Sequence, residues 1–477
     1  MDEPQDSGAT QLNRGVLGLT AITFQGITHM APAAGVMLSA PFIATFAGPA
    51  MGLAFGLAGI IALLLAHAVA QLARHLPSAG GFFSYISRAL SPKLGFLVSW
   101  VYFLYDAMVP ILCTVIIGGY AESTLKSEYD IVFPWWLYAV VVWLALGVIS
   151  FYGVKLSIAL AIALTLIEVG ITLALSLFIF GQNGISAHDV SLGFTLDGIP
   201  KPQVHGLFLG MVFSVLSYTG FESTAPLAEE TRDPRRNVTR AIYIGTIAMV
   251  IYYVIFGFAT SVGFGSDRVA ADFPSSNNPY YTIAKSVWGG SGTLLILLAL
   301  INSGWGCSLA GQSAVVRVYY KMADVGVFPR QFARLHPKHK SPHFAIFVQT
   351  VFNIALGLFC GFTLGTVNTF GVLGAMITFG MIFVYGSALL AVPVFYLREH
   401  RSEFRVFSHV VLPALGAVAL APVFWYNISP FPPWPFNIAP IAVMIWLVIG
   451  IFVVAYLAKY RSEQLAASTR LIVGEGE

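Results

Sequence analysis

The chain has 477 residues, a formal net charge of +3 and a mean hydropathy of +0.78; 57% of its residues are hydrophobic and only 10% are charged. A soluble domain carries about 25% charged residues, and a helix needs about 20 mostly apolar residues to cross a bilayer. The composition therefore excludes an ordinary soluble protein, and the apolar stretches leave no room for a separate soluble catalytic domain.

Taken in chain order, the apolar stretches predict twelve membrane-spanning helices separated by short polar segments. The predicted spans are 15–46, 49–74, 94–121, 134–152, 156–181, 203–228, 240–265, 280–322, 343–361, 366–396, 409–428 and 438–458.

The distribution of positive charge orients these spans. With the N-terminus inside the cell, the outer loops hold only Lys126, Lys201, Arg268 and Lys285, which leaves 21 of the 25 Lys and Arg residues on the inner side. Cytoplasmic loops are enriched in Lys and Arg. We therefore expect a multi-pass protein of the cell membrane whose two tails, residues 1–14 and 459–477, are cytoplasmic.

Other features argue against several functions. The first ten residues are acidic and polar, with no basic region or cleavage site, so they do not resemble a signal peptide. Cys113, Cys307 and Cys360 fall within apolar spans and are expected to pack as small hydrophobic side chains. No nucleotide-binding motif and no hydrolase motif is present. We therefore expect no cofactor, no metal site, no nucleic acid partner and no enzymatic activity.

Two predicted spans are interrupted in their middle. Thr28–Gly35 breaks the first, where Pro32 removes a backbone donor and Gly35 weakens the helix. Ser217–Ser223 breaks the sixth. Breaks at matching positions of two five-helix halves are typical of inverted-repeat transporters, because unwound backbone in a bilayer is tolerated where it lines a cavity. The alternative is that the proline and glycine residues serve helix packing alone.

Three further stretches carry a family resemblance. They are Leu76–Tyr85 with Gly95, Phe96 and Trp100; Gly220–Ser223 with Ala228–Asn237 and Arg240–Ile242; and Arg317–Gly326 with Phe328, Pro329, His336, Pro337, Ser341 and Pro342. In this order they resemble the amino acid–polyamine–organocation transporter superfamily over nearly the whole chain. The resemblance implies an all-α membrane fold with two inverted five-helix repeats, 15–181 and 203–396, followed by two further helices at 409–458. It also implies alternating access, with helices 1, 2, 6 and 7 moving against helices 3, 4, 8 and 9.

The first break departs from the family pattern. Many members carry a Gly-x-Gly-type turn there, whose amides bind a substrate carboxylate, whereas this chain has Met30–Gly35. The remaining amides still lie at the N-terminus of a half-helix, which carries partial positive charge. The residues that we expect to line the substrate site at this break are His29, Met30, Ala31, Ala33, Ala34 and Gly35; for His29, a structural role is the alternative.

Asp106 and a set of residues near the second break complete the predicted substrate site. By resemblance, Asp106 lies on a turn that faces the cavity, where a carboxylate would attract an ammonium group; the alternative is a structural hydrogen bond to a neighbouring helix. Aromatic rings can stack on an organic cation. The other residues assigned to the site are Tyr218, Thr219, Gly220, Phe221 and Trp305.

Glu222 and Glu168 are the predicted coupling or gating residues. An ionisable group at membrane depth costs about 2.5–3.5 kcal/mol on insertion scales, and burial disfavours the charged form of a carboxyl group. In resembling antiporters a glutamate at the position of Glu222 responds to protons. Glu168 falls where some sodium-independent members place a lysine, so it could bind a proton or help to ligate Na⁺. For both, a fixed structural carboxylate is the alternative.

Together these features predict a secondary active transporter, an amino acid permease, that moves a small amine-bearing solute by proton symport. We favour an amino acid as the solute; the alternative is a polyamine or other organic amine, moved by symport or exchange. A channel or a non-transporting sensor with the same fold is less favoured. The expected partners are the solute, a coupling ion (H⁺, with Na⁺ as the alternative) and membrane lipid, and the oligomeric state stays open.

Two charged segments lie on the predicted cytoplasmic side. Glu229–Arg236 is expected to form salt bridges with the loop after the second span, including Arg88, either as a gate or as a solvated loop. The histidines of 336–343 are interleaved with Lys and Pro, which favours a basic loop over a metal site.

Overall fold

The computed structural model describes residues 12–276 and 278–470, and the regular structure of this part of the chain is helical, apart from one isolated bridge between Leu17 and Thr231. Most of the predicted N-terminal tail, residues 1–11, and the end of the C-terminal tail, residues 471–477, lie outside the described residues. The helices of the first half are α1 (Leu19–His29), α2 (Pro32–Ala47), α3 (Met51–His75), α4 (Phe82–Ala89), α5 (Pro92–Asp106), α6 (Val109–Tyr129), α7 (Trp135–Phe151), α8 (Val154–Asn183) and α9 (Ala187–Phe194).

The second half of the chain also consists of helices. Its helices are α10 (Gln203–Ser217), the 3₁₀ helix η1 (Phe221–Glu230), α11 (Pro234–Phe264), α12 (Val269–Asp272), α13 (Pro279–Trp288), α14 (Gly290–Asp324), η2 (Arg330–Ala333), α15 (His343–Leu364), α16 (Thr366–Glu399), η3 (Arg401–Glu403), the π-helical turn η4 (Phe407–Val411), α17 (Leu412–Ile428), α18 (Ile438–Tyr460), α19 (Ser462–Ala467) and η5 (Ser468–Arg470).

Within the described residues, eleven helical segments are long and apolar enough to cross a membrane, and the shorter apolar helix α7 accounts for the remaining predicted span. The expectation of an all-helical membrane protein is confirmed. Large apolar side chains such as Leu177, Leu390, Val418 and Phe452 are exposed on the outer faces of these helices. A helix surface that stays apolar on its outward face is suited to lipid and not to water.

Three of the spans are interrupted between two helical segments. The predicted breaks lie between α1 and α2 and between α10 and η1, so both are confirmed as interruptions. A third break, between α5 and α6 at Ala107 and Met108, was not predicted. Pro110 explains this break, because it has no N–H to donate to the carbonyl of Asp106 one turn earlier.

The predicted eighth span, 280–322, was wrong at its start. α13 ends at Trp288, and α14 begins anew at Gly290. Gly289 between them has a φ of 66°, a left-handed conformation that glycine adopts at low cost and that ends a helix. α13 is therefore a short separate helix, and α14 alone is the span.

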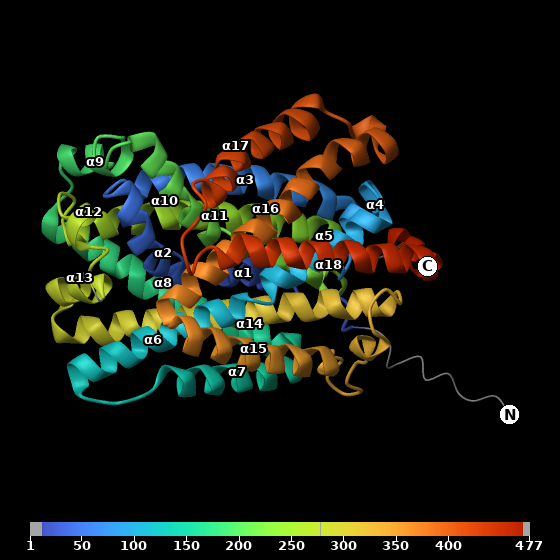
Figure 1. Cartoon of the computed structure of the whole chain (residues 1–477), viewed down its shortest axis with the longest axis horizontal. Coiled ribbons are helices and arrows are strands. Elements are labelled where there is room, and N and C mark those ends of the chain that lie inside the picture. Colours follow the sequence, from blue (N-terminus) through green and yellow to red (C-terminus); the bar gives the residue numbers. More distant parts are fainter. Residues whose placement is uncertain (1–11, 277, 471–477) are drawn as a thin grey trace.

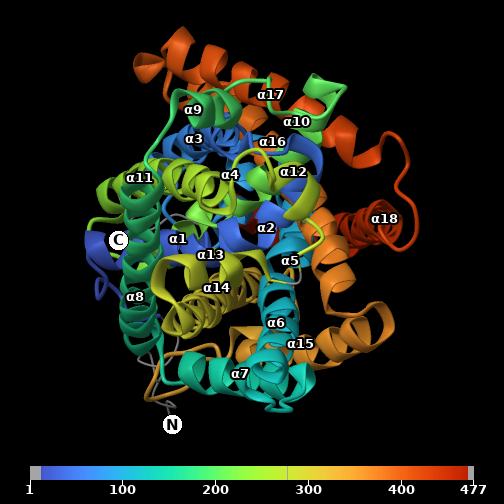
Figure 2. The ribbon, with the colours of Figure 1, turned by 90° about the vertical axis from the view of Figure 1, so that its left-hand side faces the viewer.

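The long helices run along the long axis of the molecule, with the short helices α9, α12 and α13 gathered at one end (Figure 1). Seen from that end, α1 and α2 lie near the centre, while α7, α17 and α18 lie at the periphery (Figure 2). Burial agrees with this arrangement: the apolar stretch of the third span is 100% buried, whereas those of 407–428 (η4 with α17) and of α18 are only 28% and 22% buried. The broken spans therefore sit where side chains from several helices can reach them.

Candidate functional site

The first break places unwound backbone in the buried centre. α1 ends at His29, and Ala31 has a φ of 53°, a left-handed conformation that is uncommon for a residue with a side chain. Pro32 starts α2 and has no N–H, so the first amides available at the N-terminus of α2 are those of Ala33 and Ala34.

Both of these amides are already bonded within the chain. The N–H of Ala33 donates to Oε2 of Glu168 on α8 at 3.0 Å, and the N–H of Ala34 donates to the hydroxyl of Ser303 on α14 at 3.0 Å. Glu168 is fully buried, and its other oxygen has no hydrogen-bond partner among the described residues. The position where a substrate carboxylate was expected is thus occupied by a carboxylate of the protein itself.

The second break requires a glycine. α10 ends at Ser217, and Gly220 has a φ of 123°. A Cβ atom at Gly220 would lie 2.8 Å from the carbonyl carbon of His29, which is closer than real contacts allow. The two breaks therefore touch backbone to backbone.

Glu222 closes the second break. Its carboxylate accepts the N–H of Gly220 at 2.9 Å and the hydroxyls of Tyr105 on α5 and Tyr385 on α16. Phe221 stacks on Tyr385, with ring centroids 5.3 Å apart. The carboxylate of Glu222 therefore connects the second broken span to α5 and α16.

Side chains also tie the two breaks to each other. The hydroxyl of Tyr253, on α11, donates to the carbonyl of Met30 at the first break and to the carbonyl of Ser217 at the second, the latter at 2.9 Å. The hydroxyl of Ser217 in turn donates to the carbonyl of Gly35 at 2.7 Å. Movement at one break must therefore disturb the other.

Asp106 and His29 form a buried pair beside the breaks. Asp106 ends α5 and is fully buried, and its Oδ1 lies 3.3 Å from Nε2 of His29. Among the described residues, neither carboxylate oxygen nor Nδ1 of His29 makes a hydrogen bond. Buried polar atoms are almost always hydrogen-bonded, so this pair, like the free oxygen of Glu168, can still form hydrogen bonds.

A cavity of about 50 Å³ lies between the two breaks. A water molecule needs roughly 10–15 Å³ of such space, so the cavity holds a few waters and is too small for an amino acid. The cavity is therefore too small for a solute in this conformation, and the helices around it must move before a solute can fit.

The cavity wall contains part of the predicted site. The predicted residues that line it are His29, Met30, Ala31, Ala34, Gly35 and Thr219. The predicted residues that do not line it are Ala33, Asp106, Tyr218, Gly220, Phe221 and Trp305. Asp106 nevertheless contacts His29, which is one of the residues that line the cavity. The hydroxyl of Tyr218 donates to the carbonyl of Phe55 on α3 at 2.9 Å.

Ten further residues line the cavity wall but were not assigned to the substrate site from the sequence. They are Leu38, Ser39, Val109, Leu112, Cys113, Leu216, Ser217, Cys307, Phe370 and Ile377. Cys113 and Cys307 are free, and their sulfur atoms lie 3.7 Å apart. As expected, they pack as small buried side chains, but they do so in the wall of the site.

An aromatic stack separates the small cavity from a larger one. Phe42 on α2 stacks on Phe213 of α10 and on Phe370 of α16, with ring centroids 4.4 Å and 5.8 Å apart. Phe370 lines the small cavity, whereas Phe42 and Phe213 line a mostly apolar cavity of about 540 Å³ that reaches Pro433 in the connection between α17 and α18.

The charged segment after the second break is paired, but not as expected. Glu229 lies 2.9 Å from Nζ of Lys321 and Glu230 lies 2.5 Å from Nε of Arg317, both on α14. The loop after the second span contributes the N–H of Ala79, which donates to Glu229 at 3.2 Å.

The predicted pairing of this segment with Arg88 was wrong. Arg88 pairs with Glu399 at 2.9 Å instead. The reason is packing: η1 lies against α14, whereas α4, which carries Arg88, lies against α16.

Comparison with known proteins adds independent findings. A sequence model described as "Amino acid permease" matches residues 21–466. The chain is 24% identical over 417 residues to the low-affinity putrescine importer PlaP of Escherichia coli, covering 85% of each chain. It is 27% identical over 336 residues to L-asparagine permease 1 of Mycobacterium tuberculosis, covering 68% of this chain and 67% of that relative. It is also 23% identical over 340 residues to the gamma-aminobutyric acid permease of Bacillus subtilis, covering 67% and 66%.

Proposed function

The chain belongs to the amino acid permease family, and on that premise we propose that it moves an amino acid or a closely related amine across the cell membrane by proton-coupled alternating access. Members of this family are transporters, and we assign no enzymatic activity. Both termini are placed in the cytoplasm, and residues 15–181 and 203–396 are assigned as the two inverted repeats. The resemblance and the charge distribution support these assignments.

One observation carries the proposal: a small cavity lies between two broken spans that are hydrogen-bonded to each other. Tyr253 bonds the carbonyls of Met30 and Ser217, so both breaks share one side chain. A solute that fills the cavity must displace its walls, because about 50 Å³ is too small to hold it. Binding and helix movement are therefore expected to be coupled, as alternating access requires.

The amine end of the solute has a chemically suitable partner in the His29–Asp106 pair. Asp106 is buried, and its carboxylate makes no hydrogen bond within the described residues. Hydrogen bonds between an ammonium and a carboxylate are among the strong ones in proteins. We assign Asp106 to amine recognition, with His29 between it and the cavity.

Two carboxylates supply the sites for coupling. Glu168 accepts an N–H of the first break and Glu222 accepts an N–H of the second. A carboxylate is attracted to the N-terminus of a half-helix, which carries partial positive charge. Protonation of the carboxylate removes this attraction. It would therefore loosen the backbone at a break, which supports proton coupling. For Glu168, ligation of Na⁺ is the alternative.

The test is uptake of radiolabelled amino acids into proteoliposomes with an imposed pH gradient. Accumulation above the external concentration, abolished by a protonophore and unchanged when Na⁺ is replaced by choline, is the expected result. Equilibration without accumulation would indicate a channel, and accumulation that requires Na⁺ would overturn proton coupling.

A second candidate is an amine that lacks a carboxylate, and the occupied amides of the first break favour it. Glu168 and Ser303 take the donors that a substrate carboxylate would need. The matched ligands γ-aminobutyrate and 1,4-diaminobutane separate the two candidates in a thermal-shift assay, because they differ in one end group. A ligand at 100 times its Kd stabilises the protein by about 2.7 kcal/mol. Stabilisation by the diamine alone would select the second candidate.

A further inference from the structure

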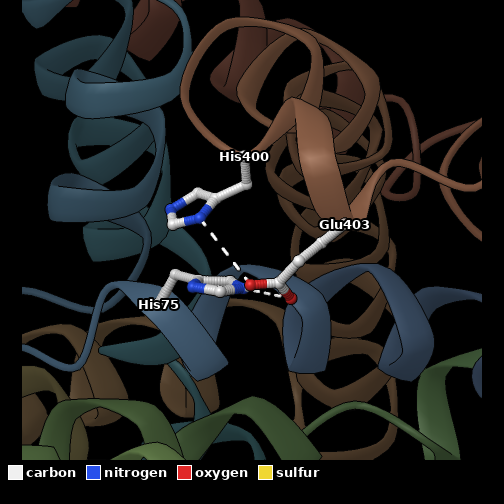
Figure 3. Close-up of side chains that lie close together, drawn as sticks. All are labelled: His75, His400 and Glu403. Carbon is white, nitrogen blue, oxygen red and sulfur yellow. Dashed lines mark ion pairs between the residues drawn. The ribbon is translucent and has the colours of Figure 1, made fainter.

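Two histidines and a glutamate lie close together at the end of α3 (Figure 3), and none of the three lines the central cavity. His75 is the last residue of α3, His400 directly follows α16, and Glu403 lies in η3. Nε2 of His75 lies 3.5 Å from Oε2 of Glu403, and Nδ1 of His400 lies 4.0 Å from Oε1. The three ligand atoms all lie within 4.8 Å of one another.

We propose that His75, His400 and Glu403 bind a divalent transition-metal ion, with Zn²⁺ the best match. Imidazole and carboxylate ligands bind Zn²⁺ at about 2.0–2.2 Å in a tetrahedral arrangement, which places any two of them roughly 3.4 Å apart. The contacts to Glu403 are already near that separation. Two nitrogens and one carboxylate suit Zn²⁺ better than Mg²⁺ or Ca²⁺, which prefer oxygen ligands.

The site is held by packing on one side and open on the other. The side chain of His75 is only 13% exposed. Its ring lies against that of His400, with centroids 3.9 Å apart and planes tilted by 33°, and edge-on against Tyr396 at 5.5 Å. Nε2 of His75 is buried and makes no hydrogen bond within the described residues. The side chains of His400 and Glu403 are 32% and 40% exposed, so an ion can reach the ligands from solvent.

Arg74 is the competitor of the ion. Its Nη2 lies 3.3 Å from Oε2 of Glu403, the oxygen that also faces His75. The side chain of Arg74 is 55% exposed, and exposed ion pairs are worth little. A divalent ion can therefore displace the guanidinium. Arg235 is a second nearby positive charge that acts on His75, so removing either arginine should favour metal binding.

The experiment measures Zn²⁺ binding to the full-length protein, purified in detergent without a histidine tag, by competition with a chromophoric zinc chelator. One ion per chain is expected. The variants His400→Ala and Glu403→Gln, both at partly exposed positions, should bind at least about tenfold more weakly. Arg74→Gln should bind more tightly.

His339→Ala is the matched control. His339 lies in the loop before α15, where its N–H donates to Nδ1 of His336 at 3.2 Å, and this loop forms no such cluster within the described residues. The control should bind Zn²⁺ like the parent, and all variants should melt like the parent without metal. Absence of stoichiometric binding by the parent, or equal binding by His400→Ala, would overturn the proposal. Binding needs no transport, so the proposed function is tested separately.

Discussion

At the scale of single residues, the centre of the molecule depends on carboxylates that hold unwound backbone. Glu168 bonds the N–H of Ala33, and Glu222 bonds that of Gly220. Each is fully or almost fully buried. Both carboxylates therefore make the hydrogen bonds of a fixed structural group, and their role in coupling stays a prediction.

Replacing Glu222 by Gln should remove the pH dependence of uptake. The carboxylate accepts three hydrogen bonds, whereas the amide would turn a donor toward a tyrosine hydroxyl or a backbone N–H. A lost or mismatched buried hydrogen bond costs about 1–3 kcal/mol. Initial uptake rates across a pH series, together with melting temperatures, measure both effects.

Tyr385→Phe is the control for Glu222→Gln. It removes one donor but keeps a carboxylate that can titrate. Its uptake should therefore keep the pH dependence of the parent, at a lower rate. An unchanged pH profile in Glu222→Gln would exclude Glu222 from coupling.

Glu168→Gln should abolish accumulation driven by a pH gradient while preserving solute exchange. The glutamine oxygen can still accept the N–H of Ala33, so the break stays capped, but the side chain can no longer take up a proton. Uptake under a pH gradient and counterflow without a gradient are the two measurements. Gradient-driven accumulation at the parent level would show that Glu168 is structural.

Asp106→Asn should weaken solute binding by at least about tenfold, which is about 1.4 kcal/mol. Asparagine keeps the shape of the side chain but removes the negative charge that faces His29 and the amine. Binding is measured by scintillation proximity with the solute that stabilises the parent most. Ser99→Ala, on the same helix and outside the cavity wall, is a control that should bind like the parent.

At the scale of elements, the stack of Phe42, Phe213 and Phe370 brings α2, α10 and α16 together over the central cavity. α2 and α10 are the outer halves of the first and sixth spans if the proposed orientation holds. The stack is then the barrier between the solute site and the larger cavity beyond it. Opening would require the rings to separate.

Phe213→Ala should make the cavity cysteines accessible to a thiol reagent. Truncating a packed phenylalanine leaves a void and costs up to about 3–5 kcal/mol, and here the void joins the two cavities. In a Cys360→Ser background, labelling of Cys113 and Cys307 by a charged methanethiosulfonate should become faster than in the parent. Phe362→Ala, at an exposed position on α15, should leave the rate unchanged.

At the scale of the whole molecule, ionic links at one end connect parts that alternating access would have to move. Glu229 and Glu230 tie the second broken span to α14. The proposed metal ligands join α3 to the segment between α16 and α17. The family resemblance implies that α3 belongs to the moving group of helices, and this assignment stays a prediction.

A metal ion at His75, His400 and Glu403 should therefore slow transport. Micromolar Zn²⁺ on the side of this cluster is expected to lower uptake by the parent, since the ion fixes α3 to its neighbour. His400→Ala should transport normally and resist the inhibition. Equal inhibition of both proteins would mean that Zn²⁺ acts elsewhere. Uptake is compared between proteoliposomes with Zn²⁺ inside and proteoliposomes with Zn²⁺ outside, which shows on which face of the membrane the ion acts.

Local sequence patterns alone predict the membrane class, the spans, the positions of two breaks and the family resemblance. These features follow from local properties. The length of an apolar stretch decides whether it can cross a bilayer. Pro32 and Gly220 weaken a helix whatever the tertiary contacts of the segment are. Local reasoning failed at Gly289, where a single left-handed glycine divides an apolar stretch.

Which side chains meet depends on how the helices pack, and this could not be predicted from the sequence. The N–H of Ala33 is bonded by a glutamate 135 positions away, Arg88 pairs with Glu399, and His75 joins residues that follow α16. Such partners depend on which helices pack together and on which face each presents. Nothing in the local sequence encodes that choice, because many apolar helix faces can pack against one another with similar free energy, and the sum of all contacts selects among them.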